Sequence, residues 1–498
     1  QKEAISSSAI KFESALLAAQ ACSKEGKYDE ALAYIDPLFH SETFTPEERD
    51  TALLEKSTVL LMAGRVSELK SVLASSDKNA DMPRYLLLKA EACYYAKEYS
   101  EAIKHYEAIL GNYADSLPGR SAAYGVAHAM LKNGQKQDAR NAFLKFFEKY
   151  PDDRQAAVAL YSAILLDSEL GLKNEGVSDA KIYLERYAND DNAREARFIL
   201  GRLYTDLNNV GAAVRVYQEY ENIYPDDPRL PDVYYLLGHN FALFKDMDKA
   251  NSYYGKITRQ NDSNLYYSAQ KNIVENKLSS GKDFEAAQVL FALMKDFPEN
   301  DLDIVTFIWT AKKYIDASQY KDALEVIRLA GLKKNQANRN IEIAYYRSEA
   351  QRGLNDYGQA IEGYNECIAL DKERGEFTGP ALIGIGLSLK GKGALEEAIQ
   401  SFEKAIQFNP EDNTVAMNAR YYLAELLLQQ QRYEEAARMF MLVSILYDDQ
   451  RFVPDALYGA AVAFHKAGKE KESQKAYNDI LNGFPSYDKI ESLKKILE

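Results

Sequence analysis

The chain has 498 residues, of which 46% are hydrophobic and 27% charged, and its formal net charge at neutral pH is −14. This acidic balance excludes a protein that binds nucleic acid or an anionic membrane surface through its overall charge. The sequence contains no run of about eighteen apolar residues, so it predicts no membrane-spanning helix.

The first eleven residues contain three consecutive serines and are predicted to form a loose lead. A first pair of helices is predicted from Phe12 to Phe39. Thr45, Pro46 and Glu48 then form the pattern of a capping box, with a threonine N-cap, a proline at the first helical position and a glutamate three residues after the cap. The next helix is therefore expected to begin at Pro46.

Along the whole chain, two short amphipathic helices joined by a turn recur as one unit, as in the stretch 380–410. A small residue, usually alanine, marks the second helix of each unit and serves as its anchor. The thirteen predicted anchors are Ala31, Leu69, Ala102, Ala139, Ala180, Ala213, Ala250, Ala287, Ala323, Ala360, Ala398, Ala436 and Ser473. Such regular spacing indicates a repeat protein in which units stack along one axis.

Two more positions recur in register with the anchor. Four residues after it every unit has a large apolar or aromatic residue, such as Phe402, and twelve residues before it most units have a small one, such as Gly386. Glu275 is the exception in the second set. Proline also recurs eleven or twelve residues after the anchor, at Pro151, Pro225, Pro298, Pro410 and Pro485. We expect the two helices to cross closely at the small residues, with the aromatic residue filling the space between neighbouring units.

The largest irregularity is the step of 41 residues from Ala139 to Ala180, where LGLKNEGVSDA contains two glycines and predicts an extra loop. It suggests two sets of repeats, about four in 1–170 and about nine in 171–498. A local bulge in one continuous array is the alternative. After Pro485 a final helix is predicted to cap the array, with Lys494 and Lys495 on its outer face.

This register of small residues, aromatic residues, alanine and proline resembles the tetratricopeptide repeat (TPR) family across essentially the whole chain. The resemblance implies an all-α fold, a right-handed α-α superhelix or TPR solenoid of about thirteen helix-turn-helix units. In that family the first helices line a concave groove that binds peptides or proteins.

The long units and the YPDD and FPE turns are similar to those of TPR proteins from bacterial cell envelopes. We therefore expect a periplasmic or cell-envelope location, with a cytoplasmic one as the alternative. The chain begins at Gln1 in place of methionine, which removal of a secretion signal or a cloning boundary would each explain.

Motifs for catalysis and metal binding are absent from the sequence: it has no HExxH, no clustered Cys/His, no phosphate-binding glycine motif and no GxSxG elbow. We expect no enzyme activity, no cofactor and no metal. Aspartate pairs precede several helices and are interpreted as structural, through helix capping. These pairs are Asp152-Asp153, Asp190-Asp191, Asp226-Asp227 and Asp448-Asp449. The cysteines, Cys22, Cys93 and Cys367, lie in different units and are predicted not to pair.

Candidate binding residues lie on the first helices, eleven and fifteen positions before the anchor, where the resemblance places the concave face. The predicted groove consists of Tyr124, His128, Phe198, Arg202, Tyr235, His239, Lys312 and Tyr421. Aromatic and basic side chains suit an extended peptide or a partner helix, with Arg202 and Lys312 pairing carboxylates. The alternative for the aromatic residues is that they belong to the core.

The sequence thus predicts a non-catalytic scaffold or adaptor that binds protein or peptide partners. Two other classes stay open. One is a self-assembling structural protein that forms homo-oligomers, and the other is a regulatory subunit of a bacterial envelope enzyme complex. Apolar residues on the terminal helices would favour self-assembly. They are Phe12, Leu16, Leu17, Ile490, Leu493 and Ile496.

Overall fold

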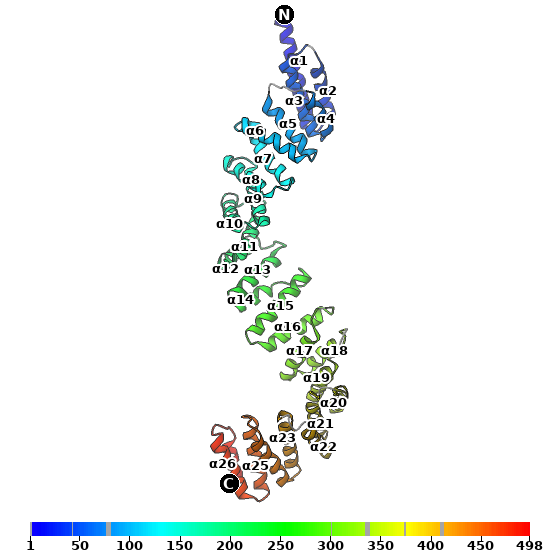
Figure 1. Cartoon of the computed structure of the whole chain (residues 1–498), viewed down its shortest axis with the longest axis vertical. Helices are drawn as coiled ribbons and strands as arrows, with labels where there is room; N and C mark the ends of the chain where they lie inside the picture. Colours follow the sequence, from blue (N-terminus) through cyan, green and yellow to red (C-terminus); the bar gives the residue numbers. More distant parts are fainter. Residues whose placement is uncertain are drawn as a thin grey trace. The chain divides into compact units, whose positions relative to one another are not determined.

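A computed structural model of the chain describes residues 2–41, 43–75, 81–299, 301–333, 339–372, 375–408 and 413–498. Within these residues all regular secondary structure is helical, in 27 α-helices without a strand (Figure 1). The chain divides into two compact units, Gln1–Ile257 and Thr258–Glu498. Each unit is built from helix pairs, in which a first helix and a second helix are joined by a short turn.

The first unit contains seven helix pairs. They are α1 (Lys2–Lys24) with α2 (Tyr28–His40), α3 (Pro46–Met62) with α4 (Val66–Ala74), α5 (Met82–Tyr95) with α6 (Tyr99–Asn112), α7 (Leu117–Lys132) with α8 (Lys136–Lys149), α9 (Ala156–Leu170) with α10 (Lys173–Arg186), α11 (Ala193–Asp206) with α12 (Val210–Ile223), and α13 (Leu230–Leu243) with α14 (Met247–Tyr254). The two helices of a pair are in contact, and the second helices from α2 to α12 each also contact the first helix of the next pair.

The second unit contains six pairs and a last helix. They are α15 (Ser263–Ser279) with α16 (Asp283–Asp296), α17 (Ile304–Asp316) with α18 (Tyr320–Ala330), α19 (Asn340–Gly353) with α20 (Tyr357–Leu370), α21 (Thr378–Lys392) with α22 (Leu395–Phe408), α23 (Asn413–Gln429) with α24 (Tyr433–Leu446), α25 (Phe452–Lys466) with α26 (Glu470–Gly483), and the single helix α27 (Ile490–Leu497). In α27 Leu493 is buried whereas Lys494 and Lys495 are exposed. The thirteen predicted units and the final helix are confirmed.

The chain start differs from the prediction, because α1 begins at Lys2 and residues 2–11 of the predicted loose lead are helical. Serine costs only a few tenths of a kcal/mol in a helix interior, which a helix anchored further along tolerates. Buried Phe12 and Ala19 provide that anchor. The predicted capping box is confirmed: the Thr45 backbone N–H donates to Glu48 Oε2 over 2.8 Å, and the Glu48 N–H donates to Thr45 Oγ1 over 3.1 Å.

The turn inside each pair contains one residue with a positive φ, two positions before the second helix. Seven of these thirteen residues are glycines, which adopt that backbone conformation without steric cost. The other six are Lys97, Asn208, Lys245, Ser318, Asn355 and Gln431. Each lies five positions before the anchor of its pair, so this backbone feature locates every anchor independently of the side chains.

Two predicted anchors are wrong by this measure. The turn residue Gly171 has a φ of 72° and places the anchor of its pair at Gly176, not at Ala180. Of the residues predicted to form an extra loop, 173–180 therefore belong to α10, and Ala139, Gly176 and Ala213 are evenly spaced by 37 residues. The misassignment arose because this pair has a large residue on its first helix and a small one on its second, the reverse of most other pairs. The predicted division at residues 170 and 171 stays a prediction, and α9 and α10 are in contact there.

The exchange involves the positions twelve before and four after the anchor. Where most pairs have a small and then a large residue, this pair has Ile164 on the first helix and Ala180 on the second, both fully buried. In the pair α15–α16 the anchor is Ala286, not Ala287, so the position twelve before it is the buried Val274. The exceptional Glu275 is instead exposed.

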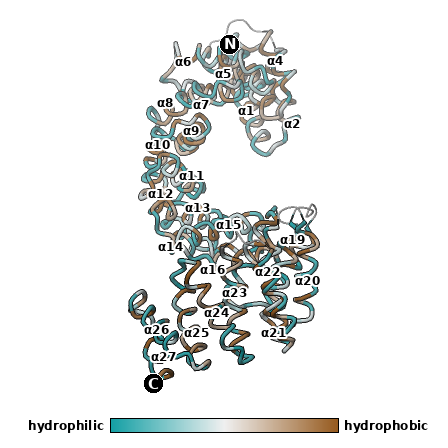
Figure 2. Tube along the Cα trace, turned by 60° about the horizontal axis from the view of Figure 1, so that its bottom comes forward, coloured by the Kyte–Doolittle hydropathy of each residue, from teal (hydrophilic) through white to brown (hydrophobic). Residues whose placement is uncertain are grey.

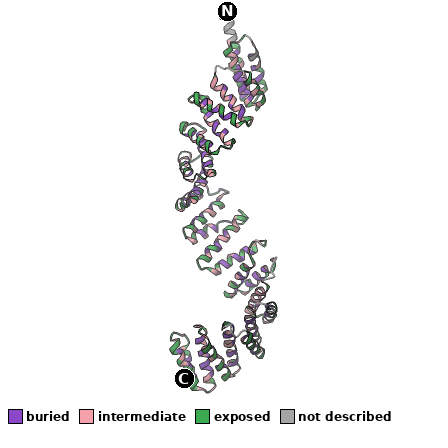
Figure 3. Ribbon diagram, viewed as in Figure 1, coloured by how far each residue is buried: buried purple, intermediate pink, exposed green. Residues whose placement is uncertain are grey.

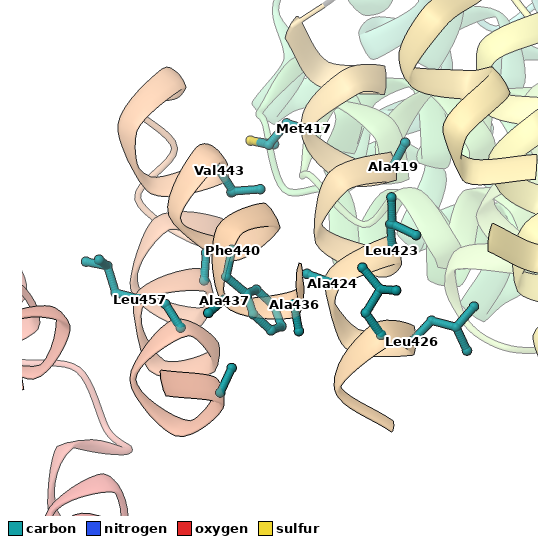
Figure 4. Close-up of a cluster of buried hydrophobic side chains, with 14 of the residues drawn as sticks. Met417, Ala419, Leu423, Ala424, Leu426, Ala436, Ala437, Phe440, Val443 and Leu457 are labelled. Carbon is teal, nitrogen blue, oxygen red and sulfur yellow. The ribbon is translucent and has the colours of Figure 1, made fainter. Parts of the chain in front are cut away.

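In most pairs the core is formed where an aromatic residue of the second helix meets the small residue of the first. A Cβ atom added to Gly386 would lie 2.5 Å from the Phe402 ring, and the same close approach joins Gly201 to Tyr217. In Figure 4, Phe440 and Ala436 of α24 lie beside Ala424 of α23. Buried stripes alternate with exposed ones along each helix (Figure 3), and the hydropathy of the trace alternates in the same way (Figure 2). The predicted closure at Pro410 lies outside the described residues.

Candidate functional site

The first helices form the inner layer of each unit. Successive first helices contact each other at α1–α3, α3–α5, α5–α7 and α9–α11, and throughout the series from α17 to α27. Successive second helices make fewer such contacts. The layer whose helices approach more closely is the inner side of a curved stack, so side chains on the free face of the first helices line the inner surface.

A row of aromatic residues runs along this layer in the first unit, fifteen positions before each anchor. Its members are Tyr124 on α7, Tyr161 on α9, Phe198 on α11 and Tyr235 on α13, all half-buried. Each ring packs on an aromatic ring of the second helix in the same pair. The ring centroids are 5.2 Å apart for Tyr124 and Phe146, 5.9 Å for Tyr161 and Tyr183, 6.2 Å for Phe198 and Tyr220, and 5.5 Å for Tyr235 and Tyr254. One edge of each ring is therefore core, and the other faces solvent.

Tyr161 is the member that the sequence analysis missed. With the anchor placed at Ala180, the residue fifteen positions earlier was not Tyr161, so the row had a gap between Tyr124 and Phe198. The signal that identifies it is the positive-φ glycine at 171, which restores the spacing of 37 residues. Four consecutive first helices then each carry an aromatic residue at the same position of the repeat.

Next to the aromatic row, one helical turn further along each first helix, lies a more exposed row. Arg202 and His239 are exposed, whereas His128 is half-buried against its neighbours. The His128 ring lies 4.6 Å from Tyr124 and 4.9 Å from Phe143, measured between centroids. Burial, helped by the nearby Lys132, lowers the pKa of His128 below its ordinary value, so its imidazole is neutral at pH 7. Arg202 is therefore the fixed positive charge of this row.

A charged pair holds two neighbouring first helices together at this surface. Arg229, just before α13, forms an ion pair with Glu195 of α11, and its guanidinium lies 5.5 Å from the centroid of the Phe198 ring. Burial raises the pKa of Tyr161, with Glu195 adding to the rise, so that hydroxyl stays protonated. The Tyr161 hydroxyl can thus donate a hydrogen bond at this surface, next to the charges of Arg229 and Glu195.

The two predicted residues of the second unit, Lys312 and Tyr421, are not neighbours. Lys312 is exposed on α17, and Tyr421 on α23 is half-buried, with its ring 5.7 Å from Phe440 and 5.4 Å from Phe452. Glu349 of α19 lies in the same row and is already bound by its own pair, since Arg352 donates to it over 2.6 Å. The first unit therefore carries the longer run of aromatic residues at this position, on four consecutive first helices.

The structural interpretation of the aspartate pairs is confirmed. One carboxylate of each pair accepts a backbone N–H at the start of the next helix, which orients the chain into that helix. These are Asp153 from Gln155 at 2.8 Å, Asp190 from Asn192 at 2.9 Å, Asp227 from Arg229 at 2.8 Å and Asp449 from Arg451 at 2.9 Å.

All three cysteines have free thiols. In the part of the chain that the structure describes, no group of three His, Cys, Asp or Glu residues is arranged to hold a metal ion. Across the same residues, no helix combines the length and apolar character needed to cross a bilayer.

Comparison with known proteins agrees with this architecture. Family models of the tetratricopeptide repeat match residues 121–153, 169–228, 389–452 and 455–487. No curated protein sequence matches the chain.

Several solved structures are similar to the chain at low sequence identity. One is a complex of Naa15/Naa10 bound to HypK-THB, with 15% identity and a TM-score of 0.42 over 98% of this chain and 78% of that chain. Another is the Cut9–Hcn1 hetero-tetramer of APC/C, with 13% identity and a TM-score of 0.35 over 98% and 96%. YrrB, a TPR protein with an unusual peptide-binding site, has 18% identity and a TM-score of 0.30 over 41% and 98%. The matched models show tetratricopeptide repeats within both units, and the helix pairs outside the matched residues have the same arrangement.

Proposed function

We propose that the protein is a non-catalytic scaffold that binds an extended segment of a partner protein along the inner surface of its first unit. The observation that carries the proposal is the row Tyr124, Tyr161, Phe198 and Tyr235, in which half-buried aromatic residues recur every 37 residues on consecutive first helices. Aromatic side chains whose position is already fixed by packing lose little conformational entropy when they bind, and they dominate the binding energy of many interfaces.

The chemistry of the surface defines the partner. Rings that are half-buried offer apolar contact, and Arg202 offers one exposed guanidinium beside them. An extended segment with apolar side chains and a carboxylate placed to reach Arg202 fits this arrangement. Because the aromatic residues recur once per repeat, successive parts of the segment would contact successive helix pairs.

Photo-crosslinking in native cells tests this function. A photoreactive residue placed at position 202 should crosslink to one recurrent partner. The same residue at Arg215 is the matched control, because Arg215 is exposed on α12, the outer helix of the same pair. Equal crosslinking from both positions, or crosslinking only to a second copy of this chain, would contradict the proposal.

Location and enzyme association are extensions of the same proposal. We infer a periplasmic or cell-envelope setting from the resemblance of the turns, with the cytoplasm as the alternative. Fractionation of native cells with antibody detection measures this directly. Association with an envelope enzyme would make the protein a regulatory subunit, and co-purified enzyme activity distinguishes that role from a simple adaptor.

Self-assembly is the second candidate, and exposed apolar residues on the terminal helices favour it. Ile10 and Leu17 are 64% and 66% exposed and lie seven residues apart on α1, so they share one helix face. Phe12 and Leu493, which were expected to contribute to such an end surface, are buried within their own units. Sedimentation analysis of the Leu17→Glu variant tests this role, because self-assembly through α1 requires the variant to dissociate.

A further inference from the structure

A second surface lies on the outer side of the first unit, away from the inner aromatic row. Here a groove of about 790 Å³ runs between the second helices α6 and α8, with α7 as its floor. Small-molecule pockets typically measure about 300–1,000 Å³. The floor is apolar, with Ala123, Met130, Ala142 and Phe146 among its residues. Lys104, Lys145 and Lys149 line its rim together with Glu107 and Asp138.

The repeats provide internal copies of this groove, because each residue has counterparts 37, 74 and 111 positions later. In the first copy, Ile103, Met130 and Ala142 are replaced by Arg140, Asp167 and Asp179. The Arg140 side chain fills that space by donating to both carboxylates, over 2.8 Å to Asp167 and 3.0 Å to Asp179.

In the second copy, Ala123 and Lys145 are replaced by Arg197 and Glu219. These two side chains form an ion pair over 3.6 Å. The chain thus occupies this position again with its own charged groups.

The third copy, between α12 and α14 over α13, shows what an aromatic occupant looks like. Ala123, Ala142, Met130 and Lys145 correspond there to Tyr234, Tyr253, Phe241 and Lys256. The rings of Phe241 and Tyr253 are stacked, with centroids 5.5 Å apart and planes inclined by 6°. The Lys256 ammonium lies 4.4 Å from the centroid of Tyr253 and 4.8 Å from that of Tyr234.

Polar groups beside these rings have partners within the chain. Gln218 donates to the hydroxyl of Tyr253 over 3.3 Å, and Lys256 pairs with Glu221 over 2.7 Å. The chain therefore fills this position with two tyrosines and a cation that lies over both rings, an arrangement stabilised by stacking and by the cation–π interaction.

The open groove is formed by the equivalent positions of α6, α7 and α8, but it has small residues in place of the tyrosines. Ala123 and Ala142 stand where the tyrosines would be, and Lys145 stands at the position of the cation. Lys104 pairs with Glu101 and Lys149 with Asp115, whereas Lys145 is exposed and forms no ion pair within the described part of the chain. The apolar floor and the unpaired ammonium of Lys145 are thus both available to a ligand.

We propose that the groove between α6 and α8 binds an aromatic side chain, tyrosine or tryptophan, of a partner polypeptide, with the Lys145 ammonium over its ring. Glu107 holds the position of Gln218 and is placed to accept a hydrogen bond from the hydroxyl of a tyrosine. In the third copy Lys256 pairs with Glu221, whose counterpart in the open groove is Leu110, so Lys145 lacks that carboxylate and favours a partner with an acidic residue beside the aromatic one. This surface is separate from the inner aromatic row and goes beyond the proposed function.

The decisive variant is Ala123→Tyr combined with Ala142→Tyr, which fills the groove as α13 and α14 fill theirs. The third copy has the same pair in the same register, so the variant is expected to fold, and circular dichroism checks this. Lys145→Met is the matched variant, because it keeps an unbranched apolar stem and removes only the charge. The probe is a random peptide library selected on the wild-type full chain.

Selected peptides are expected to contain an aromatic residue beside acidic ones. They should lose affinity about tenfold or more on the filled variant, as expected for loss of a central anchor. On Lys145→Met they should lose about two- to fivefold, the size of an exposed cation–π interaction. Replacing the aromatic residue of the peptide by alanine should abolish binding to the wild type.

Four outcomes would overturn the proposal. They are selection of no peptide, selection of peptides without an aromatic residue, unchanged affinity on the filled variant, and displacement of the peptide by an equal concentration of N-acetyltyrosinamide. The last would assign the groove to free aromatic molecules. If the filled variant does not fold, Lys145→Glu replaces it, and unchanged affinity of acidic peptides for Lys145→Glu refutes the proposal equally.

Discussion

Removing the Phe402 ring should open a cavity in the pair α21–α22, and refilling the cavity from the other helix should restore stability. Phe402 is fully buried, with its ring 2.5 Å from where a Cβ of Gly386 would lie. Phe402→Ala is therefore expected to cost about 3–5 kcal/mol, the range for a core phenylalanine. Gly386→Ile alone should cost about 1–3 kcal/mol, because its side chain would overlap the Phe402 ring.

The double variant tests whether the two positions share one volume. Ile164 and Ala180 occupy the equivalent positions of α9 and α10, so the chain already contains this reversed pairing. Phe402→Ala with Gly386→Ile should then cost no more than about 1–2 kcal/mol, with isoleucine in place of glycine contributing about 0.5 kcal/mol of helix propensity. The coupling free energy between the two changes should be about 3 kcal/mol or more.

Native-state hydrogen exchange of the full chain measures this cycle, because it reports the local opening free energy of each helix. Amides of α21 and α22 should lose protection in Phe402→Ala and regain it in the double variant. Amides of α11 and α12 are the internal control, since each repeat contacts only its neighbours. Additive costs, or a double variant as unstable as Phe402→Ala, would refute the size-exchange explanation and the register built on it.

Three further predictions follow from the same structure. Arg202→Glu should weaken capture of the crosslinked partner by about tenfold while thermal unfolding stays unchanged, with Arg215→Glu as the outer-helix control; equal losses of binding would contradict the inner-surface assignment. Lys97→Gly should stabilise the pair α5–α6 by about 1 kcal/mol in hydrogen exchange, because Lys97 has a φ of 64°. Burial and its coupling to the neighbouring carboxyl raise the pKa of Asp167 to about 7 from 3.8. The folded state then binds this proton more tightly than the unfolded state. The opening free energy of α9 should therefore fall as pH rises from about 4 to about 7, by on the order of 4 kcal/mol, and stay level above that. Asp167→Asn should remove most of this slope, and a stability that rises over the same interval would show the opposite linkage.

Repeating local patterns determined the architecture from the sequence alone. The recurrence of small, aromatic and anchor residues predicted thirteen helix pairs, and Thr45 with Glu48 predicted where α3 begins, because helix starts and helix faces depend on residues a few positions apart. The aspartates before the helices were interpreted correctly for the same reason. Three aromatic members of the inner row in the first unit were also named in advance, since their position relative to the anchor is a property of one helix pair.

Only the tertiary structure showed the features that depend on how side chains from different helices fill a common space. Ile164 with Ala180 fills the same space as a small and a large residue in the other pairs, so a search for small anchors shifted by one helical turn and missed Tyr161. The pairing of Glu195 with Arg229, and the groove left open by Ala123 and Ala142, also join residues from different helices. An alanine has the same appearance in a sequence whether a neighbouring side chain fills the space beside it or leaves that space to a partner, and only the packed helices distinguish the two.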